Sequence, residues 1–463
     1  MTPEETLRVA VVGAGPAGFY AAGHLLAGDR PVCVDLFDRL PTPFGLVRAG
    51  VAPDHPKIKS VVRVYEKTAA KEGFRFFGGI ELGRDLHRAD LLERYHAVVY
   101  AIGAATDRRL GIPGEDLPGS EAATSFVGWY NGHPDFADRE YDLDIERVVV
   151  VGNGNVAIDC ARMLALSLDE LRATDTADHA IEPLASDAVK EIVILGRRGP
   201  AQAAFTNPEL RELGELELAD VIVDPADLEL DDASEAWLES DAASKTAREN
   251  VRILREYAAR EPAGKPKRIV LRFLTSPVEI LGDGRVEQIV VERNRLEPRE
   301  DGSLAARATG ERETLDTGLV LRSIGYKGIA IPEMPFDEGK GTIPNVAGRV
   351  LDGEQHVTGE YVTGWIRRGP SGVIGTNKKD GQEAAGSVMA DAEAGILNAP
   401  PSDDDIADLL AERGVEPVDW EGWQRIDEHE VQAGSESGRP RVKLSRYEEL
   451  LDAARAAAAG KRS

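Results

Sequence analysis

The fold of the first part of the chain is indicated by one stretch of sequence, Arg8-Val-Ala-Val-Val-Gly-Ala-Gly-Pro-Ala-Gly18. A run of branched and small apolar residues passes directly into three spaced glycines, and a helix pattern follows. Gly13 permits a tight turn, Gly15 lets a pyrophosphate approach the backbone, and Gly18 lets the helix pack closely on the strand. The amides at the start of the helix then face that pyrophosphate. The stretch therefore predicts a βαβ unit that binds a dinucleotide.

A carboxylate stands where such a unit needs one. The second apolar strand ends in Asp38, 20 residues beyond Gly18, and a carboxylate at this position accepts hydrogen bonds from a ribose. The alternative, a glycine turn without a ligand, explains the glycines but not the placement of the acid.

A second copy of the pattern, Arg147-Val-Val-Val-Val-Gly-Asn-Gly-Asn-Val-Ala157, lies further along the chain. Its next strand, Glu191-Ile-Val-Ile-Leu195, runs into Gly196 and then Arg197 and Arg198 instead of an acid. An acid would repel a ribose 2′-phosphate, whereas arginine forks pair with it. The second site is therefore expected to prefer NADP(H). The alternative is a solvated arginine pair.

Two dinucleotide sites in one chain imply a flavin beside a nicotinamide, so FAD is assigned to the first site. The stretch Trp365-Ile-Arg-Arg-Gly-Pro-Ser-Gly-Val-Ile-Gly-Thr-Asn377 supports this assignment. It is a glycine-rich loop leading into a helix, and its amides suit the flavin end where negative charge develops on reduction. The pairs Arg367-Arg368 and Lys378-Lys379 either raise the potential around the flavin or are simple surface charge.

The continuous Val/Ile runs are typical of parallel strands buried on both faces. We expect an α/β protein with two Rossmann-like, glutathione-reductase-like domains, each a doubly wound parallel sheet, plus a C-terminal helical extension. The expected boundaries are 1–106 (FAD-binding domain, first segment), 107–325 (NADP-binding domain), 326–397 (returning segment of the FAD-binding domain) and 398–463 (extension of unknown role).

Composition limits the function classes. The chain has 463 residues, of which 42% are hydrophobic and 29% charged, and no stretch approaches the roughly 18 consecutive apolar residues of a membrane span. The acidic start and the absence of a secretory signal pattern favour a cytoplasmic protein. The net charge of −26 argues against binding to nucleic acid or an anionic membrane.

Cysteine usage excludes further classes. The two cysteines, Cys33 and Cys160, form no C-x-x-C pair, and we expect both to be buried and inert. A disulfide reductase and a chain with its own cysteine-ligated iron–sulfur cluster are therefore disfavoured, and no metal site is expected.

Longer motifs carry a resemblance to a known family. They include Asp38-Arg-Leu-Pro-Thr-Pro-Phe-Gly-Leu-Val-Arg48, Gly50-Val-Ala-Pro-Asp-His-Pro-Lys-Ile-Lys59 and Gly364-Trp-Ile-Arg-Arg-Gly-Pro-Ser-Gly-Val-Ile374, with Gly196-Arg-Arg-Gly-Pro200 and Glu209-Leu-Arg-Glu212 between them. From about residue 8 to 395 the chain resembles adrenodoxin reductase and its bacterial relatives, the ferredoxin–NADP reductases best known from actinobacteria.

The resemblance implies particular contact residues. The implied FAD contacts, besides the glycine turn, are Ala17, Asp38, Leu46, Leu82, Trp365, Gly372, Val373 and Ile374. The implied NADP contacts are Arg108, Asn153, Gly154, Asn155, Val156, Arg197, Arg198, Glu209 and Gly372. The family usually has glutamate where this chain has Asp38, which puts the affinity for FAD in question.

The resemblance also implies the activity: electron transfer between NADPH, as a hydride, and a one-electron iron–sulfur carrier such as an acidic ferredoxin, through FAD. We expect the protein to be a monomer. His55 is implied to lie near the flavin with Glu212 as its partner; the alternatives are a structural loop histidine and a surface charge. Asp159, in the helix after the second glycine motif, is expected to be a solvated or structural residue. The competing functions are another NADPH-dependent flavoprotein oxidoreductase, of diaphorase or monooxygenase type, and a flavin redox sensor without turnover.

A basic stripe offers a docking hypothesis for the acidic carrier. Lys245, Arg248, Arg252 and Arg255 share one face if residues 242–260 form a helix. The alternative is a solvated face balanced by Glu249 and Glu256.

Overall fold

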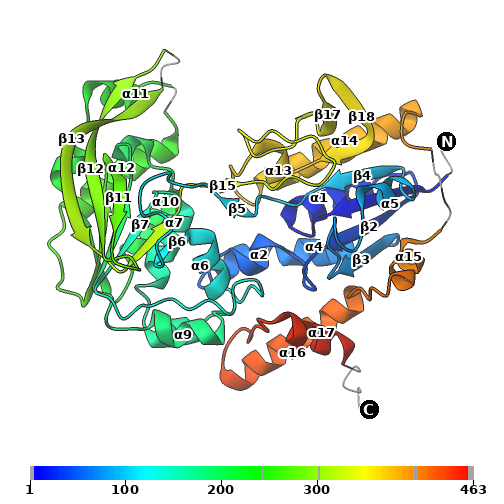
Figure 1. Ribbon diagram of the computed structural model, residues 1–463, viewed down its shortest axis with the longest axis horizontal. Coiled ribbons are helices and arrows are strands. Elements are labelled where there is room, and N and C mark those ends of the chain that lie inside the picture. The colour runs from blue at the N-terminus through cyan, green and yellow to red at the C-terminus, as the bar shows by residue number, and fades with distance from the viewer. Residues whose placement is uncertain (1–4, 242, 301–302, 400–401, 403, 457–463) are drawn as a thin grey trace. The chain divides into compact units, whose positions relative to one another are not determined.

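The computed structural model describes residues 5–241, 243–300, 303–399, 402 and 404–456. The chain forms two compact units, shown in Figure 1. Unit 1 comprises Met1–Val51, His55–Thr106 and Gly325–Ser463, and unit 2 comprises Ala52–Asp54 and Asp107–Ile324. Unit 1 is thus built from segments that precede and follow unit 2 in the chain.

A seven-stranded sheet forms the centre of the described part of unit 1, in the order β16-β17-β18-β4-β1-β2-β3. The strands are β1 (Leu7–Val12), β2 (Val32–Asp38), β3 (Phe74–Gly78), β4 (Ala97–Tyr100), β16 (Asn345–Val346), β17 (Arg349–Asp352) and β18 (Gln355–Val362). The run from β3 to β18 is parallel, whereas β16 and β17 are antiparallel. Val9, Val11 and Val99 are completely buried, as the apolar runs predict for strands covered on both faces.

Helices cover this sheet. They are α1 (Pro16–Leu25), α2 (Leu46–Ala49), α3 (Pro56–Lys59), α4 (Val62–Ala69), α5 (Arg88–Leu92), α13 (Trp365–Arg368), α14 (Thr376–Ala394), α15 (Ile406–Glu412), α16 (Trp420–Ser437) and α17 (Tyr447–Arg455). Helices α1 and α14 pack together closely because their contact is made of small residues. A Cβ at Gly381 would lie only 2.8 Å from the backbone nitrogen of Ala21.

Unit 2 has its own parallel sheet, with the order β6-β14-β7-β8-β10-β9 in its described residues. The strands are β6 (Ser120–Ala122), β7 (Arg147–Val151), β8 (Glu191–Leu195), β9 (Ala219–Val223), β10 (Lys267–Arg272) and β14 (Leu319–Arg322). The helices are α6 (Ala123–Tyr130), α7 (Asn155–Met163), α8 (Leu168–Arg172), α9 (Asp178–Leu184), α10 (Asn207–Leu213), α11 (Asp232–Glu239) and α12 (Lys245–Ala258), with the short 3₁₀ turns η1 (Pro200–Gln202) and η2 (Pro225–Leu228).

Unit 2 also contains an antiparallel sheet that the sequence patterns did not predict. It consists of β11 (Thr275–Leu281), β12 (Gln288–Pro298) and β13 (Leu304–Asp316), drawn in green in Figure 1. Its apolar residues Ile280, Ile289 and Val291 pack into one core cluster with Val149 and Val193 of the parallel sheet. Where the chain passes between the units, β5 (Thr106–Asp107) pairs with β15 (Tyr326–Lys327).

The predicted fold class is confirmed, including the helical C-terminal region. That region packs into unit 1: Ile406 and Leu410 join the core on one side of its sheet, and Trp423, Ile426 and Leu450 join the core on the other. No helix among the described residues combines the length and the apolar character needed to span a membrane.

The prediction for the two cysteines is half wrong. Cys160 is completely buried, and burial raises the pKa of its thiol. Cys33 is exposed, because it lies near the amino end of β2, where little covers the strand. Partial burial and the nearby Asp35 carboxylate nevertheless raise the pKa of Cys33, so neither thiol has the character of a reactive thiolate.

Candidate dinucleotide sites

The first glycine turn joins β1 to α1 in unit 1. Gly13 has a φ of +109°, and a Cβ there would lie 2.5 Å from the carbonyl oxygen of Ala101. A Cβ at Gly18 would lie 1.9 Å from the carbonyl oxygen of Gly13, so the turn and the helix touch through glycine. Beside Gly15, by contrast, a Cβ would meet nothing within 4 Å. This open space next to the first turn of α1 is where a pyrophosphate fits.

Asp38 ends β2 next to this turn. Its Oδ2 accepts a hydrogen bond from the Ala14 amide at 2.7 Å, and its Oδ1 accepts one from the Leu40 amide at 2.9 Å. Burial raises the pKa of Asp38, although both amide donors oppose that shift. The carboxylate thus holds the end of β2 against the turn, and each of its oxygens keeps a lone pair for a further donor.

The other side of the proposed FAD site is built where β18 ends. Gly364 has a φ of +72°, and a Cβ there would come within 2.6 Å of the Ala17 Cβ. Three buried polar atoms follow one another here without a hydrogen-bond partner among the described residues: Thr363 Oγ1, Trp365 Nε1 and Arg367 Nη1. Buried polar atoms are normally bonded, so this group fits a polar ligand such as the flavin ring of FAD.

The loop after α13 carries the predicted contacts Gly372, Val373 and Ile374. Gly372 has a φ of +80°, and Val373 is 59% exposed. The neighbouring arginines are engaged by α14: Arg367 donates to Glu383 and Arg368 to Asp380. Their charge is therefore largely offset, which disfavours a strong effect of this pair on the potential around the flavin, while Arg367 Nη1 stays without a partner among the described residues.

Leu46 and Leu82 complete the predicted FAD contacts. Leu46 begins α2 and is 41% exposed. Leu82 is half-buried in the loop that follows β3. All the predicted FAD contacts therefore lie at or beyond the carboxyl ends of parallel strands, which is the ligand-binding edge of such sheets.

The second glycine turn, between β7 and α7 in unit 2, repeats the first. Gly152 has a φ of +124°, and a Cβ there would lie 2.0 Å from the Ser323 carbonyl oxygen. A Cβ at Gly154 would meet nothing within 4 Å, which again leaves room for a pyrophosphate. Asn155 Oδ1 accepts a hydrogen bond from the Thr206 amide at 2.8 Å, so this side chain braces the segment that leads to α10. Val156 is half-buried in the first turn of α7.

Arg197 and Arg198 follow β8 without an acidic partner. Arg197 is exposed, Arg198 is half-buried, and neither forms an ion pair within the described residues. Burial lowers the pKa of Arg198, and the positive charges of Arg197 and Arg299 lower it further. Cations gathered without a counter-ion fit an anionic group such as a ribose 2′-phosphate.

Arg299 was missed by the sequence reasoning because it belongs to the unpredicted antiparallel sheet. That sheet is tied directly to the arginine turn: Asn294 Nδ2 donates to the Arg197 carbonyl at 3.0 Å, and the Leu274 amide donates to the Arg198 carbonyl at 3.0 Å. Arg299 stands one residue past the end of β12. The contacts of Asn294 and Leu274, both distant in sequence from Arg198, bring this sheet to the turn, so no local signal marks Arg299.

A second missed residue, Arg162 on α7, gathers carboxylates within unit 2. It is 2% exposed and donates to Asp54 at 2.5 Å, to Asp159 at 2.7 Å and to Glu209 at 3.1 Å. Burial alone would lower the pKa of Arg162, but these carboxylates outweigh it and raise the pKa. Asp159 is therefore structural, as expected, and Glu209 already has one partner in this buried cluster. Glu212 lies at its edge, 3.6 Å from Arg162.

The remaining sequence-predicted residues fall as follows. Arg108 is exposed just after β5. His55 is buried at the start of α3 in unit 1, whereas Glu212 is half-buried on α10 in unit 2. The pairing of His55 with Glu212, and the contact of Gly372 with NADP, stay predictions.

Comparisons with known proteins identify the family to which the chain belongs. Residues 7–194 match the family described as pyridine nucleotide-disulphide oxidoreductase. NADPH-ferredoxin reductase FprA of Mycobacterium leprae (strain TN) is 52% identical over 460 residues, which cover 97% of this chain and 99% of that protein. The chain belongs to the NADPH-ferredoxin reductase family. The family resemblance predicted from the motifs is thereby confirmed.

More distant and structural members of the NADPH-ferredoxin reductase family agree. The mitochondrial NADPH:adrenodoxin oxidoreductase of Arabidopsis thaliana is 40% identical over 460 residues, which cover 97% of this chain and 95% of that protein. The solved structure of Mycobacterium tuberculosis FprA in complex with NADPH superposes with a TM-score of 0.91 at 49% identity, covering 97% of this chain and all of that chain.

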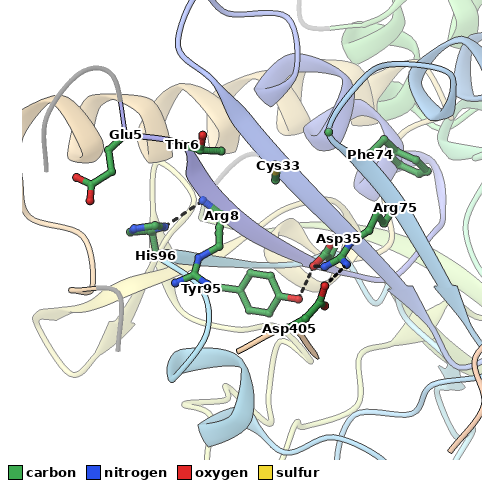
Figure 2. A pocket seen from close by; sticks show the side chains of 11 residues that line it. Glu5, Thr6, Arg8, Cys33, Asp35, Phe74, Arg75, Tyr95, His96 and Asp405 are labelled. Carbon is green, nitrogen blue, oxygen red and sulfur yellow. Dashed lines mark hydrogen bonds and ion pairs between the residues drawn. The ribbon is translucent and has the colours of Figure 1, made fainter. Parts of the chain in front are cut away.

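A hollow of about 620 Å³ lies near the amino ends of β1, β2 and β3. This is the edge of the unit 1 sheet opposite to the first glycine turn. Figure 2 shows four of its side chains turned toward one another. Arg75 donates to Asp35 at 2.7 Å and to Asp405 at 2.6 Å, and the Tyr95 hydroxyl donates to Asp35 at 2.6 Å. The network ties the segment before α15 to the sheet, so we read this hollow as structural.

Proposed function

We propose that this chain is an FAD-containing oxidoreductase that transfers electrons between NADPH and a small acidic iron–sulfur carrier of the ferredoxin type. The observation that carries the proposal is the contrast between two similar glycine turns. One is followed by Asp38, and the other by Arg197 and Arg198, which form no ion pair within the described part of the chain. The 52% identity to a protein named NADPH-ferredoxin reductase, over nearly the whole chain, supports it.

The residues divide the work between the units. A bound FAD would supply the conversion between a two-electron hydride from NADPH and single electrons for the iron–sulfur carrier. In unit 1, the turn at Gly15 holds the pyrophosphate, Asp38 the ribose, and Thr363 and Trp365 supply donors to the ring. In unit 2, Arg197 and Arg198 would hold the 2′-phosphate and so favour NADPH over NADH, which lacks that group.

The finer properties belong to the same proposal. We propose a monomer that works in the cytoplasm, with a ferredoxin-type protein as its partner; the names of the relatives refer to such a carrier. No residue acts as a nucleophile in this scheme. His55, placed by the family resemblance near the flavin, keeps its proposed role with Glu212.

A docking face for the acidic carrier is needed on a protein of net charge −26. The stripe on α12 is a poor one. Arg248 donates to the carbonyl oxygens of Leu238 and Ser240, and Arg252 pairs with Glu249 and Glu256. Arg252 and then Arg211 lower the pKa of Glu249 to about 2, as expected for a carboxylate held by cations. Arg252 therefore fits the alternative interpretation of the stripe, a solvated face whose charge is balanced by Glu249 and Glu256.

We propose instead the α3–α4 patch, defined as Lys57, Ile58, Arg63, Val64 and Lys67 of unit 1. Its lysines and arginine are exposed and form no ion pair within the described residues. Ile58 is 42% and Val64 47% exposed, so apolar surface lies among the charges. Cations steer an acidic partner, and exposed apolar side chains give it contact area.

The test of the function starts from protein purified under gentle conditions. The expected result is a yellow protein from which denaturation releases one noncovalent FAD, reduced rapidly by NADPH. With ferredoxin and cytochrome c as final acceptor, NADPH should drive sustained turnover. A diaphorase-type enzyme would reduce small acceptors but not ferredoxin, and a redox sensor would be reduced without turnover; either result would replace the proposed function.

A further inference from the structure

Glu430 on α16 is a completely buried carboxylate in the C-terminal region of unit 1. Arg48 grips it with both nitrogens of its fork, Nη2 to Oε1 at 2.5 Å and Nη1 to Oε2 at 2.8 Å. Arg441 donates to Oε2 at 3.0 Å, and the Leu444 amide donates to Oε1 at 2.9 Å. Four donors converge on one side chain, so its position is strongly determined.

Arg48 comes from a distant part of the sequence, the short helix α2. Its guanidinium lies 5.4 Å from the ring centre of Trp423 on α16, in a cation–π contact. Its carbonyl oxygen accepts a hydrogen bond from Lys443 Nζ at 3.3 Å. The C-terminal region therefore holds α2 through both its side chain and its backbone.

The segment just before α2 lies directly on the first glycine turn. The Phe44 amide donates to the Ala14 carbonyl at 2.8 Å. A Cβ at Gly45 would lie 3.0 Å from the Cα of Gly15, so the two backbones almost touch. The Phe44 ring in turn packs edge-on against the Trp423 ring, with centres 5.4 Å apart. A shift of α2 would therefore move one wall of the proposed FAD site.

We propose that Glu430 is a positioning residue for FAD binding, and that residues 404–456 are an integral part of the FAD site. The inference rests on the proposed function of unit 1. Glu430 touches neither the glycine turn nor the flavin site; it acts through Arg48. A bidentate arginine–carboxylate pair fixes orientation as well as distance. Because Glu430 is completely buried and the Arg48 side chain is only 10% exposed, loss of the Glu430 charge leaves the Arg48 guanidinium without its carboxylate, and α2 must move for that guanidinium to reach solvent.

The test compares two variants that each break one bond between the C-terminal region and the rest of unit 1. Glu430→Gln keeps the side-chain shape and removes the charge that holds Arg48. Arg413→Gln is the matched control, because it breaks the bidentate pair of Arg413 with Asp90, at 2.7 and 2.8 Å, which does not involve α2. The dissociation constant of FAD is measured by flavin fluorescence for each holoprotein, and NADP⁺ binding to the same samples is measured by calorimetry.

We expect Glu430→Gln to weaken FAD binding about tenfold or more and to change the shape of the flavin absorption bands, with NADP⁺ binding unchanged. Arg413→Gln should stay within about twofold of the unaltered protein. If Glu430→Gln does not fold, the same measurements are made on Arg48→Lys, because lysine keeps the positive charge but cannot bind the carboxylate bidentately.

Either of two results overturns the inference: unchanged FAD affinity in the folded variant at Glu430 or Arg48, or an equal loss in Arg413→Gln, which would indicate a general tether. An unaltered protein that retains no FAD would overturn the proposed function, and the inference with it. An unaltered protein that binds FAD normally beside an unchanged Glu430→Gln variant would overturn the inference alone.

Discussion

At the scale of single residues, the arginines of unit 2 differ in whether they pair with a carboxylate. Most arginines described in the antiparallel sheet of unit 2 are paired: Arg293 with Asp227, Arg295 with Glu297 and Arg312 with Glu292. Arg197 and Arg198 have no such partner among the described residues. Leaving cations unpaired costs stability through mutual repulsion, which an anionic ligand relieves.

Replacing Arg197 and Arg198 together by alanine should raise the Michaelis constant for NADPH about ten- to a hundredfold. The reason is that a hydrogen bond to a charged group contributes about 1.5–3 kcal/mol. Steady-state kinetics with both nicotinamides checks this. The Michaelis constant for NADH, which lacks the 2′-phosphate, should change little. An equal rise for both nicotinamides would mean that the arginine pair does not bind the 2′-phosphate.

Arg299→Ala should raise the Michaelis constant for NADPH more modestly, about two- to fivefold, since an exposed cation contributes at most about 1 kcal/mol. Arg307→Ala is the matched control, because it removes a cation from the partner strand that is paired with Glu297. The expected order is a measurable change for Arg299 and none for Arg307. The same change in both variants would point to distortion of the sheet.

Both glycine turns, Asp38 and the arginine pair could be predicted because their meaning lies in local spacing along a strand, turn and helix. Arg162, Arg299 and Glu430 could not, because each acquires its role from partners distant in sequence: Asp54 lies 108 residues before Arg162, and Arg48 lies 382 residues before Glu430. The buried position expected for Cys33 failed for a related reason, since an apolar run does not indicate what covers the end of a strand.

At the scale of elements, α16 and α2 are joined by a charge pair that depends on pH. Burial alone would raise the pKa of Glu430, but Arg48 and Arg441 outweigh it and hold the pKa below its usual value. A carboxylate with a lowered pKa stabilises the fold at pH values above its unfolded pKa, about 4.3. That stabilisation is lost as the pH falls through the folded-state pKa.

Glu430→Gln should therefore be less stable than the unaltered protein by about 3 kcal/mol or more at pH 7, the usual cost of breaking a buried pair. The gap should narrow as the pH is lowered from 5 toward 3, where the unaltered protein also loses the charge. Urea unfolding in the presence of excess FAD at a series of pH values measures this. A gap that stays constant with pH would mean that folding does not lower the pKa of Glu430.

At the scale of the whole molecule, a net charge of −26 opposes every acidic partner, so docking depends on local cations. Reversing Arg63 and Lys67 to glutamate should depress ferredoxin-dependent turnover severalfold at low ionic strength, with the effect shrinking as salt is added. Reduction of a small uncharged acceptor by NADPH should not change. Stopped-flow association rates across a salt series provide the measurement.

The matched control is Lys245→Glu with Arg255→Glu, which changes the net charge equally on α12. Both of these residues are exposed and form no ion pair within the described residues. A larger effect from the α12 pair than from the α3–α4 pair would move the docking face to unit 2. Equal effects would show that the carrier senses only the overall charge.

The division of unit 1 into segments on either side of unit 2 has a consequence for how the protein is made. The ribosome completes residues 107–324 while β18, α14 and α16 are still unsynthesised, and at about 5–20 residues per second these follow only after roughly ten seconds. Unit 2 can fold during that delay. The proposed FAD site at the first glycine turn stays incomplete until Thr363, Trp365 and Glu430 have been synthesised. We therefore expect flavin to bind only at the end of synthesis, and a chain that stalls late in translation to bind the nicotinamide dinucleotide without flavin.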